Sequence, residues 1–407
     1  MKRISTALFV VSALLATPLA AQDWTQWRGP ARDGAATGFK EPGAWPEALT
    51  QRWKVEVGLG YATPLVVGDR IYMFSRQGEN EVMSALDAAA GKQIWQTAYP
   101  VTFTMQSAAA RHGAGPKSTP VLANGKLYSI GMIGTITAWD AASGKQLWQR
   151  PGTGVVPMFT SHAFSPLVDG GLVIFHVGGH MKGALTAFDT NTGDVRWKWD
   201  GDGPGYGSPI VADLGGTRQI VTITQGKLVG VEAATGKLLW ERPFVSSNFT
   251  NGITPVLFEQ SIIVSGNGGP TTALSVAKKD DQWVIETLWE NADIPLRFSN
   301  AVIAHDKLFS LANRNSGQYF AVDAKTGKTA WVSDPRQAGN AAVVKAGNVI
   351  FVLEDDGELL VLPDTLTAFQ PLKRYKVAEA ETWTQPVISG NRIFVKDVSS
   401  LALWTLN

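Results

Sequence analysis

The chain has 407 residues, and its 36 lysine and arginine side chains nearly balance 35 aspartates and glutamates. This balance argues against a nucleic-acid partner, because phosphate binding requires a basic surplus or a basic stripe. The chain has no cysteine, which excludes disulfides, thiol chemistry and a lipid anchor attached to a cysteine.

The N-terminus is typical of an export signal. Lys2 and Arg3 precede an apolar run over residues 7–16, and the small residues of TPLAAQ follow it. We predict a signal peptide over residues 1–21 and an exported chain that is periplasmic or secreted. The apolar run is short for a bilayer span, so no integral membrane segment is expected after cleavage. A retained N-terminal anchor is the alternative.

Residues 22–50 precede the repeats and contain Trp24 and Trp27 in the stretch DWTQWRGPARDG. Two indole rings are costly to leave in water. We therefore predict an N-terminal strap that packs across the outside or the base of the domain. An arm that binds a partner is the alternative.

The rest of the chain repeats one unit, of which AWDAASGKQLW at residues 138–148 is an example. Alternating apolar residues before Asp140 predict a strand, and KQLW begins the next one. The Asp140 carboxylate accepts hydrogen bonds from backbone amides just ahead, and Gly144 supplies a positive φ, so the unit is a hairpin. The other turns of this form use Asp87 and Gly91, Asp189 and Gly193, Asp323 and Gly327, and the near variant Glu232 and Gly236.

A large aromatic residue follows each hairpin and needs a buried surface that a lone hairpin lacks. Docking the ring between adjacent sheets supplies this surface. Strand-opening segments such as TPLVVGDRIYMF recur as often as the aromatics, and both markers occur eight times. The predicted docking residues are Trp53, Trp95, Trp148, Trp197, Trp240, Trp289, Trp331 and Tyr375.

Each repeat holds about four strands, which is the size of a propeller blade. We predict an all-β fold, an eight-bladed β-propeller of four-stranded blades over residues 51–407. The stretch 385–407 lacks a fourth strand and the strand around Trp53 lacks a hairpin, so pairing the two closes the ring. Blade five, in ALSVAKKDDQWVIETLW, has a longer charged hairpin, and blade seven, in LLVLPDTLTAFQPLKRY, also departs from the unit.

These repeats resemble the pyrroloquinoline-quinone-type propeller family in their strand followed by D-x-x-T/S-G-x-x-x-W, over residues 53–407. The family includes quinoprotein alcohol and sugar dehydrogenases, the B subunit of the outer-membrane protein assembly machinery, and exported propellers without assigned activity. The stretches DWTQWRGPARDG and HGAGPKSTP are most similar to the last group. The resemblance implies the propeller fold, whereas the chemistry must be argued from the site.

Propellers commonly bind at one mouth of the central channel, on the loops that lead into the innermost strands. Here these loops contribute aromatic and basic side chains, which suit contacts with a protein segment or with an anion. We predict a monomer whose channel mouth binds a protein or peptide partner, or a small anionic ligand. The predicted binding residues are Tyr61, Arg111, His112, His162, Asn251, Arg297 and Trp383.

The resemblance to quinoprotein dehydrogenases implies pyrroloquinoline quinone with a calcium-type ion, which requires several converging carboxylate and amide oxygens and an aspartate base. The mouth loops hold almost no carboxylates, and Asp202, Glu379 and Glu381 are the nearest. The cysteine pair that often covers this cofactor in the family is absent, and the loops are short. His176 and His180 lack a third ligand. We therefore predict no catalytic residue, no metal and no cofactor.

Together these features predict a non-catalytic exported propeller that acts as a binding scaffold. Two alternatives stay open. One is a dehydrogenase of alcohols or sugars that uses pyrroloquinoline quinone and calcium, and the other is an outer-membrane protein assembly factor. Dye reduction with the added quinone and calcium would support the first, and a barrel-assembly partner would support the second.

Overall fold

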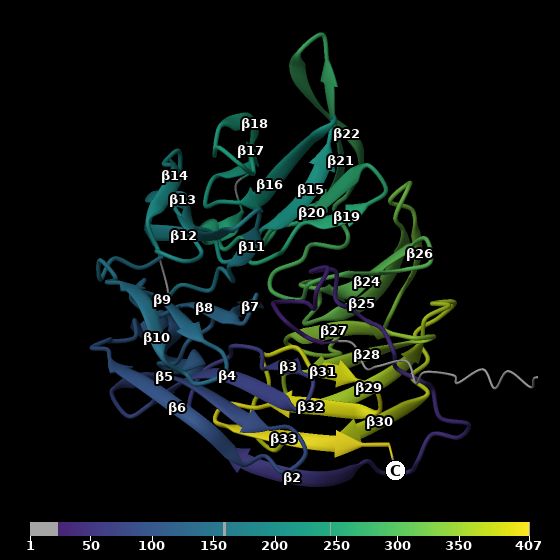
Figure 1. The fold of residues 1–407 in the computed structure, drawn as a ribbon. Helices are drawn as coiled ribbons and strands as arrows, with labels where there is room; N and C mark the ends of the chain where they lie inside the picture. Colours follow the sequence, from purple (N-terminus) through teal and green to yellow (C-terminus); the bar gives the residue numbers. More distant parts are fainter. Residues whose placement is uncertain (1–22, 158–159, 245, 407) are drawn as a thin grey trace, which may run out of the picture.

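The computed structural model describes residues 23–157, 160–244 and 246–406. Eight sheets stand in a ring around a central channel (Figure 1), which confirms the predicted eight-bladed propeller. Within a blade the strands are antiparallel neighbours that follow one another from the channel outwards. The predicted signal peptide, residues 1–21, lies outside the described residues.

Blades one to four hold four strands each, in chain order. Their bounds are β3 (Leu65–Val67), β4 (Arg70–Gln77), β5 (Asn80–Asp87) and β6 (Gln93–Pro100); β7 (Val121–Ala123), β8 (Lys126–Ile130), β9 (Ile136–Asp140) and β10 (Gln146–Arg150); β11 (Leu167–Asp169), β12 (Leu172–Gly179), β13 (Lys182–Asp189) and β14 (Val195–Trp199); β15 (Ile210–Leu214), β16 (Thr217–Ile223), β17 (Lys227–Glu232) and β18 (Leu238–Pro243).

Blades five to seven continue this order, and the last three strands of the chain belong to blade eight. Their bounds are β19 (Val256–Phe258), β20 (Ser261–Val264), β21 (Thr271–Lys279) and β22 (Gln282–Asn291); β23 (Val302–Ala304), β24 (Lys307–Ala312), β25 (Gln318–Asp323) and β26 (Thr329–Val332); β27 (Ala341–Ala346), β28 (Val349–Glu354), β29 (Glu358–Pro363) and β30 (Lys373–Lys376); β31 (Val387–Ser389), β32 (Arg392–Lys396) and β33 (Ser400–Thr405).

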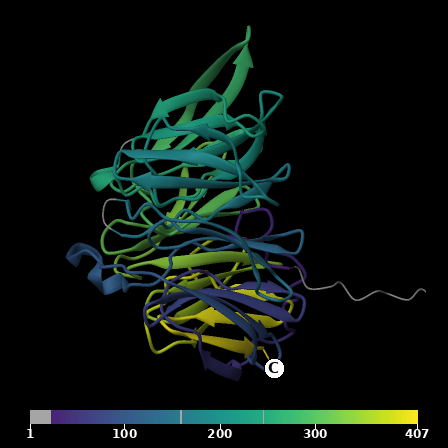
Figure 2. The ribbon, with the colours of Figure 1, turned by 60° about the vertical axis from the view of Figure 1, so that its left-hand side comes forward.

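Short 3-10 helices lie in two of the connecting loops. They are η1 (Ser107–His112), before blade two, and η2 (Ser247–Phe249), before blade five. In the part of the chain that the structure covers, no helix has the length and apolar character needed to cross a membrane. The charged hairpin predicted in blade five is formed by β21 and β22, which extend well beyond the ring in Figure 2.

The ring closes as the sequence predicts. Strand β2 (Thr50–Glu56) pairs antiparallel with β33 and becomes the outer strand of blade eight, with Trp53 opposite Leu403. This pairing leaves the ring without an open seam between its first and last blades. Blade seven departs from the four-strand expectation, because β1 (Ala35–Ala36) adds a parallel fifth strand at the channel edge of β27.

The hairpin turns form by the expected chemistry. The Asp140 carboxylate accepts the Ser143 backbone amide at 2.8 Å, and Gly144 donates its own amide to the Asp140 carbonyl at 2.8 Å with a φ of +73°. Glycine tolerates this left-handed conformation without the penalty that a Cβ brings. The turn is therefore determined locally.

The aromatic residues pack onto the turn of the next blade. The Trp148 indole donates to the Thr190 carbonyl at 3.3 Å, and a Cβ built at Gly193 would lie 2.6 Å from the Trp148 ring. The turn glycine thus leaves room for the indole of the preceding blade as well as supplying a positive φ. The same ring-to-glycine contact joins Trp53 to Gly91, Trp95 to Gly144, Trp197 to Gly236 and Trp289 to Gly327.

Trp240 shows what happens when the next blade lacks this turn. Its indole donates to Gln219 Oε1 at 2.6 Å, within its own sheet, and its ring lies over Gly230. Blade five offers no turn carbonyl or glycine at this position, because its long hairpin replaces the unit. The Trp240 ring still packs between blades four and five, but its hydrogen bond differs from those of its counterparts.

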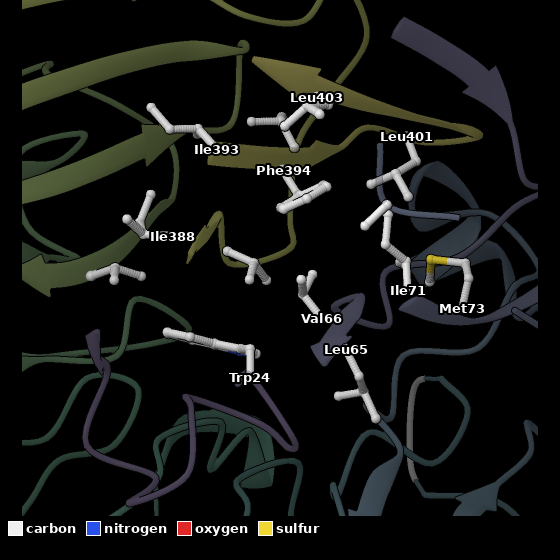
Figure 3. Close-up of a cluster of buried hydrophobic side chains, with 14 of the residues drawn as sticks. Trp24, Leu65, Val66, Ile71, Met73, Ile388, Ile393, Phe394, Leu401 and Leu403 are labelled. Atoms are coloured by element: carbon white, nitrogen blue, oxygen red, sulfur yellow. The ribbon is translucent and has the colours of Figure 1, made fainter. Parts of the chain in front are cut away.

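Residues 24–36, which we call the plug, cross the central channel. Trp24 forms a β-bridge with Val66 of blade one, and the Trp27 indole donates to Thr254 Oγ1 at 2.9 Å, beside blade five. Figure 3 shows the Trp24 ring against side chains of blades one and eight. The buried cluster around this junction also includes Leu65, Val66, Ile71, Ile388 and Phe394.

Two buried arginines of the plug bind different sides of the channel. Arg28 donates to the Ala301 carbonyl of blade six. Arg32 donates to the carbonyls of Ser165 and Pro166, each at 2.9 Å, at the entrance to blade three. The plug is thus tied to several innermost strands at once.

The predicted strap is divided between two places. Residues 37–49 cover blade seven, where Trp45 stacks on Phe39 and the Tyr375 hydroxyl donates to the Pro46 carbonyl at 2.9 Å. The plug lies in the channel. The sequence analysis predicts the whole strap, residues 22–50, on the outside or the base, and this prediction is wrong for the plug. The physical reason is that eight blades surround a space that protein packing does not leave empty.

Candidate functional site

The loops that lead into the innermost strands surround a cavity of about 330 Å³ at one mouth of the channel. Loops before every blade except blade seven contribute to its wall, and the plug contributes Trp27 to its lining. The lining residues are Trp27, Tyr61, Ala109, His112, Lys117, Thr160, Ala163, Ser165, Tyr206, Ser208, Asn248, Thr250, Gly252, Arg297, Phe298, Asn300 and Trp383.

Trp383 is the centre of an aromatic cluster in this wall. Its ring centroid lies 4.7 Å from that of His112 in an edge arrangement, 6.1 Å from Phe298 and 6.3 Å from Tyr61. The four rings come from the loops before blades one, two, six and eight. Aromatic side chains held in this way offer a large contact area at little entropic cost.

Lys117 supplies positive charge beside the Tyr61 ring. Its ammonium donates to the carbonyls of His112, Gly113 and Gly115, at 3.1 to 3.3 Å, and lies 5.6 Å from the Tyr61 ring centroid. Burial lowers the pKa of Lys117 to about 8. The side chain therefore fixes the loop that carries His112 and remains largely protonated at neutral pH.

The plug adds two further positive charges below the cavity. Burial lowers the pKa of Arg28 to about 10 and that of Arg32 to about 9, so both stay charged near pH 7. Their hydrogen bonds go mainly to carbonyl oxygens, and neither forms an ion pair with a carboxylate among the described residues. The Asp33 carboxylate offsets part of the Arg28 charge, and carbonyl dipoles balance most of the remaining buried charge. The positive potential that is left favours an anion nearby.

The structure brings four of the predicted binding residues to this cavity. Tyr61, His112, Arg297 and Trp383 all line it. The backbone of Arg111 lies in η1, next to His112, and its side chain is outside what the structure describes.

Two predicted binding residues lie elsewhere. His162 is buried, and burial lowers its pKa to about 4, so it is neutral. Asn251 is buried and donates to the carbonyls of Thr224 and Gln225, at 2.8 and 3.0 Å, which joins the loops of blades four and five. Neither lines the cavity, because some residues of such a loop face the channel and others face the neighbouring blade, and sequence position alone does not distinguish them.

Trp27 and Phe298 line the cavity but are absent from the predicted binding set. Phe298 follows Arg297 directly, and the Arg297 guanidinium lies 4.9 Å from its ring centroid. The adjacency of an arginine and an aromatic residue in a mouth loop is a signal that sequence analysis could use. Trp27 gives no such signal, because its position depends on the path of the plug.

The lining does not fit the quinone and calcium of the dehydrogenases. No aspartate or glutamate is among the lining residues, and the described residues contain no group of three or more His, Cys, Asp or Glu that could hold a metal ion. Asp202 is buried and accepts the amides of Gly203 and Gly226, both at 2.7 Å. Because a calcium-type ion requires several converging oxygens, we derive no step through it.

A buried carboxyl between blades six and seven gives a pH prediction. The Tyr319 hydroxyl donates to Glu354 Oε1 at 2.6 Å, and burial raises the pKa of Glu354 from its ordinary 4.5 to about 7. Between these values the folded chain holds a proton on Glu354 that the unfolded chain releases, so the contribution of Glu354 to the free energy of unfolding is expected to fall as the pH rises. Urea denaturation across this range measures the slope.

The Glu354→Gln variant is expected to lose this contribution, because it keeps the acceptor oxygen and cannot ionise, so its free energy of unfolding relative to that of the wild type is expected to rise with pH. Glu379→Gln, at an exposed position, serves as the control and is expected to retain the wild-type slope. Equal slopes in the wild type and in Glu354→Gln would contradict the assignment.

Comparison with known proteins shows two kinds of relative. The sequence matches the family described as outer membrane protein assembly factor BamB over residues 78–331 and 286–407. The outer membrane protein assembly factor BamB of Burkholderia pseudomallei is 26% identical and covers 85% of this chain and 85% of its own length. The dehydrogenase subunit of the quinone alcohol dehydrogenase of Acetobacter aceti is 33% identical, over only 34% of this chain and 19% of its own length.

A solved structure has the same fold. The crystal structure of BamB from Moraxella catarrhalis superposes with a TM-score of 0.63 and covers 88% of this chain and 98% of its own. The sequence identity is 18%, so this likeness shows the fold alone.

Proposed function

This chain belongs to the family of outer membrane protein assembly factor BamB, and from this premise we propose that it is a non-catalytic, exported propeller that binds a protein partner during the assembly of outer-membrane proteins. The partner contacts the channel mouth around Trp383, and the chain acts as a monomer in the periplasm.

The observation that carries this proposal is the extent of the match. The alignment with the BamB relative from Burkholderia pseudomallei covers 85% of each chain, whereas the alignment with the alcohol dehydrogenase subunit covers 19% of that subunit. A short aligned segment can be explained by blade repeats that the two proteins have in common. An alignment over 85% of each chain supports a common architecture and role. The identity of 26% leaves the partner itself to be tested.

The chemistry of the mouth supports a binding role. Trp383, Tyr61 and Phe298 present aromatic surface, and Arg297 and Lys117 present positive charge. Aromatic residues and arginine are enriched among the residues that dominate protein interfaces. The same lining lacks the carboxylate ligands that quinone catalysis requires.

Crosslinking in cells followed by purification of the tagged chain tests the proposal. We expect an outer-membrane β-barrel component of the assembly machinery to be captured and identified by mass. Deletion of the gene is expected to lower the levels of several outer-membrane barrel proteins at once. Neither outcome is expected if the chain has an unrelated envelope role.

An enzymatic assay provides the opposing test. The purified chain, incubated with pyrroloquinoline quinone, calcium and a redox dye, is expected to show no dye reduction with alcohols or sugars. Dye reduction that depends on both the quinone and the substrate would overturn the proposal. Loss of capture in the crosslinking experiment would overturn it independently.

A further inference from the structure

The mouth extends beyond the axial cavity. A second cavity, of about 410 Å³, lies over blades six and seven and shares His112, Arg297, Phe298 and Trp383 with the first. These four side chains form the boundary between the two spaces. We call the two cavities together the trough. Its further lining residues are Ser299, Leu311, Ala312, Asn313, Ser316, Gly317, Ala338, Gly339 and Asn340.

The trough has a one-sided charge. Among the side chains that the structure describes, its ionisable lining groups other than tyrosine are Lys117, His112 and Arg297, and none of its lining residues carries a carboxylate. Two carboxylates lie just outside and are already engaged: Glu381 accepts the Trp383 indole at 3.3 Å, and Asp355 accepts the Gly339 amide at 3.1 Å. An occupant with negative charge is therefore favoured.

Arg297 is placed to bind that charge. Its guanidinium is exposed and lies 4.9 Å from the Phe298 ring centroid, and it forms no ion pair with any residue that the structure describes. A guanidinium that stacks on a ring keeps its edge donors free for a carboxylate, which it can bind through two parallel hydrogen bonds.

Trp383 provides the neighbouring apolar contact. It is half-buried between His112, Phe298 and Tyr61, and Glu381 fixes the orientation of its indole. An aromatic side chain that enters beside these rings would gain offset or edge-to-face contacts on several sides. The aromatic and the charged contact points are adjacent, because Arg297 and Trp383 lie on the same boundary between the cavities.

We propose that the trough binds an extended segment of a partner protein in which an acidic residue lies next to an aromatic one, with the carboxylate on Arg297 and the aromatic ring against Trp383. This inference rests on the proposed function as a protein-binding scaffold. The shape of the trough favours an extended chain segment over a compact anion. One cavity lies on each side of the four boundary residues, and an extended segment can occupy both cavities at once.

A binding assay with synthetic peptides tests the proposal on the full mature chain. The probe is a capped, fluorescent peptide of about eight residues with alternating glutamate and phenylalanine, long enough to span roughly 26 Å when extended. Its counterpart replaces every glutamate by glutamine. Fluorescence anisotropy is expected to show binding of the acidic peptide at least about ten-fold tighter than that of the glutamine peptide.

Substitutions in the chain locate the site. Arg297→Ala and Trp383→Ala are each expected to weaken binding of the acidic peptide by at least about ten-fold. Arg52→Ala, on the exposed outer strand of blade eight, is the matched control and is expected to leave binding unchanged. The melting temperature of each variant shows whether the fold is intact.

Three results would overturn the proposal. They are equal binding of the two peptides, unchanged binding by Arg297→Ala, and tight binding of pyrroloquinoline quinone, itself an aromatic carboxylate, without binding of either peptide. Capture of the barrel component by the Arg297→Ala and Trp383→Ala variants, with no peptide binding by the wild type, would preserve the proposed role in outer-membrane protein assembly and reject the mouth around Trp383 as the contact site.

Discussion

Replacing Trp148 by alanine is expected to lower the free energy of unfolding by about 3–5 kcal/mol. The indole is 9% exposed and packs between blades two and three, over Gly193, with a hydrogen bond to the Thr190 carbonyl. Removal of the ring leaves a cavity that two rigid sheets cannot close, and it removes one of the two donors to the Thr190 carbonyl, which also accepts the Tyr128 hydroxyl at 3.0 Å. Chemical denaturation of the mature chain measures the change.

Leu147→Ala is the matched control for this experiment. Leu147 is the preceding residue and is 41% exposed, so its truncation is expected to change the free energy of unfolding by less than about 1 kcal/mol. An equal effect of both substitutions would contradict the docking role of Trp148.

A double-mutant cycle tests the contact between the ring and the turn. Gly193→Ala introduces a Cβ that would lie 2.6 Å from the Trp148 ring, at a φ of +70°. Its cost is expected to be smaller in the Trp148→Ala background, where only the backbone strain remains. Additive costs would show that the glycine serves the turn alone.

Replacing Trp24 by alanine is expected to have a comparable effect, about 3–5 kcal/mol. Trp24 is fully buried where the plug meets blades one and eight, and it belongs to the buried hydrophobic cluster that reaches across the junction where the ring closes. Its loss weakens this junction as well as the plug. Chemical denaturation gives the overall change in stability.

Hydrogen exchange distinguishes release of the plug from general destabilisation. The Val66 amide donates to the Trp24 carbonyl at 3.1 Å, and the Leu122 amide donates to the Thr25 carbonyl at 2.8 Å. In Trp24→Ala these two amides are expected to lose protection before the other strand amides of blades one and two. Trp45→Ala, which removes a half-buried ring of the strap, is expected to leave both protected. Unchanged protection in Trp24→Ala would contradict the anchoring role of the indole.

The periodic features of the propeller can be predicted from the sequence because each arises within a few residues. The turn at Asp140 and Gly144 depends on one carboxylate and one positive φ, and the alternation before it depends on a period of two. The closure of the ring is also predictable, since the strand around Trp53 and the strands after residue 385 complete one blade between them.

The contacts between blades are less predictable. The spacing of the aromatic residues indicates docking, but the second purpose of the turn glycines, which is to make room for the preceding tryptophan, is visible only when two blades are adjacent. Trp240 shows the same limit: its partner is Gln219 of its own sheet, because the next blade has lost the unit.

The blade count, the turns and the closure can be predicted from the sequence, because local chemistry and repetition encode them. Which mouth residues meet depends on the tertiary structure. It placed Arg297 and Trp383 together from different blades, buried His162 and Asn251 between blades, and directed the plug through the channel. These outcomes depend on how eight sheets are arranged around one axis, and the direction in which a loop side chain points follows from that arrangement.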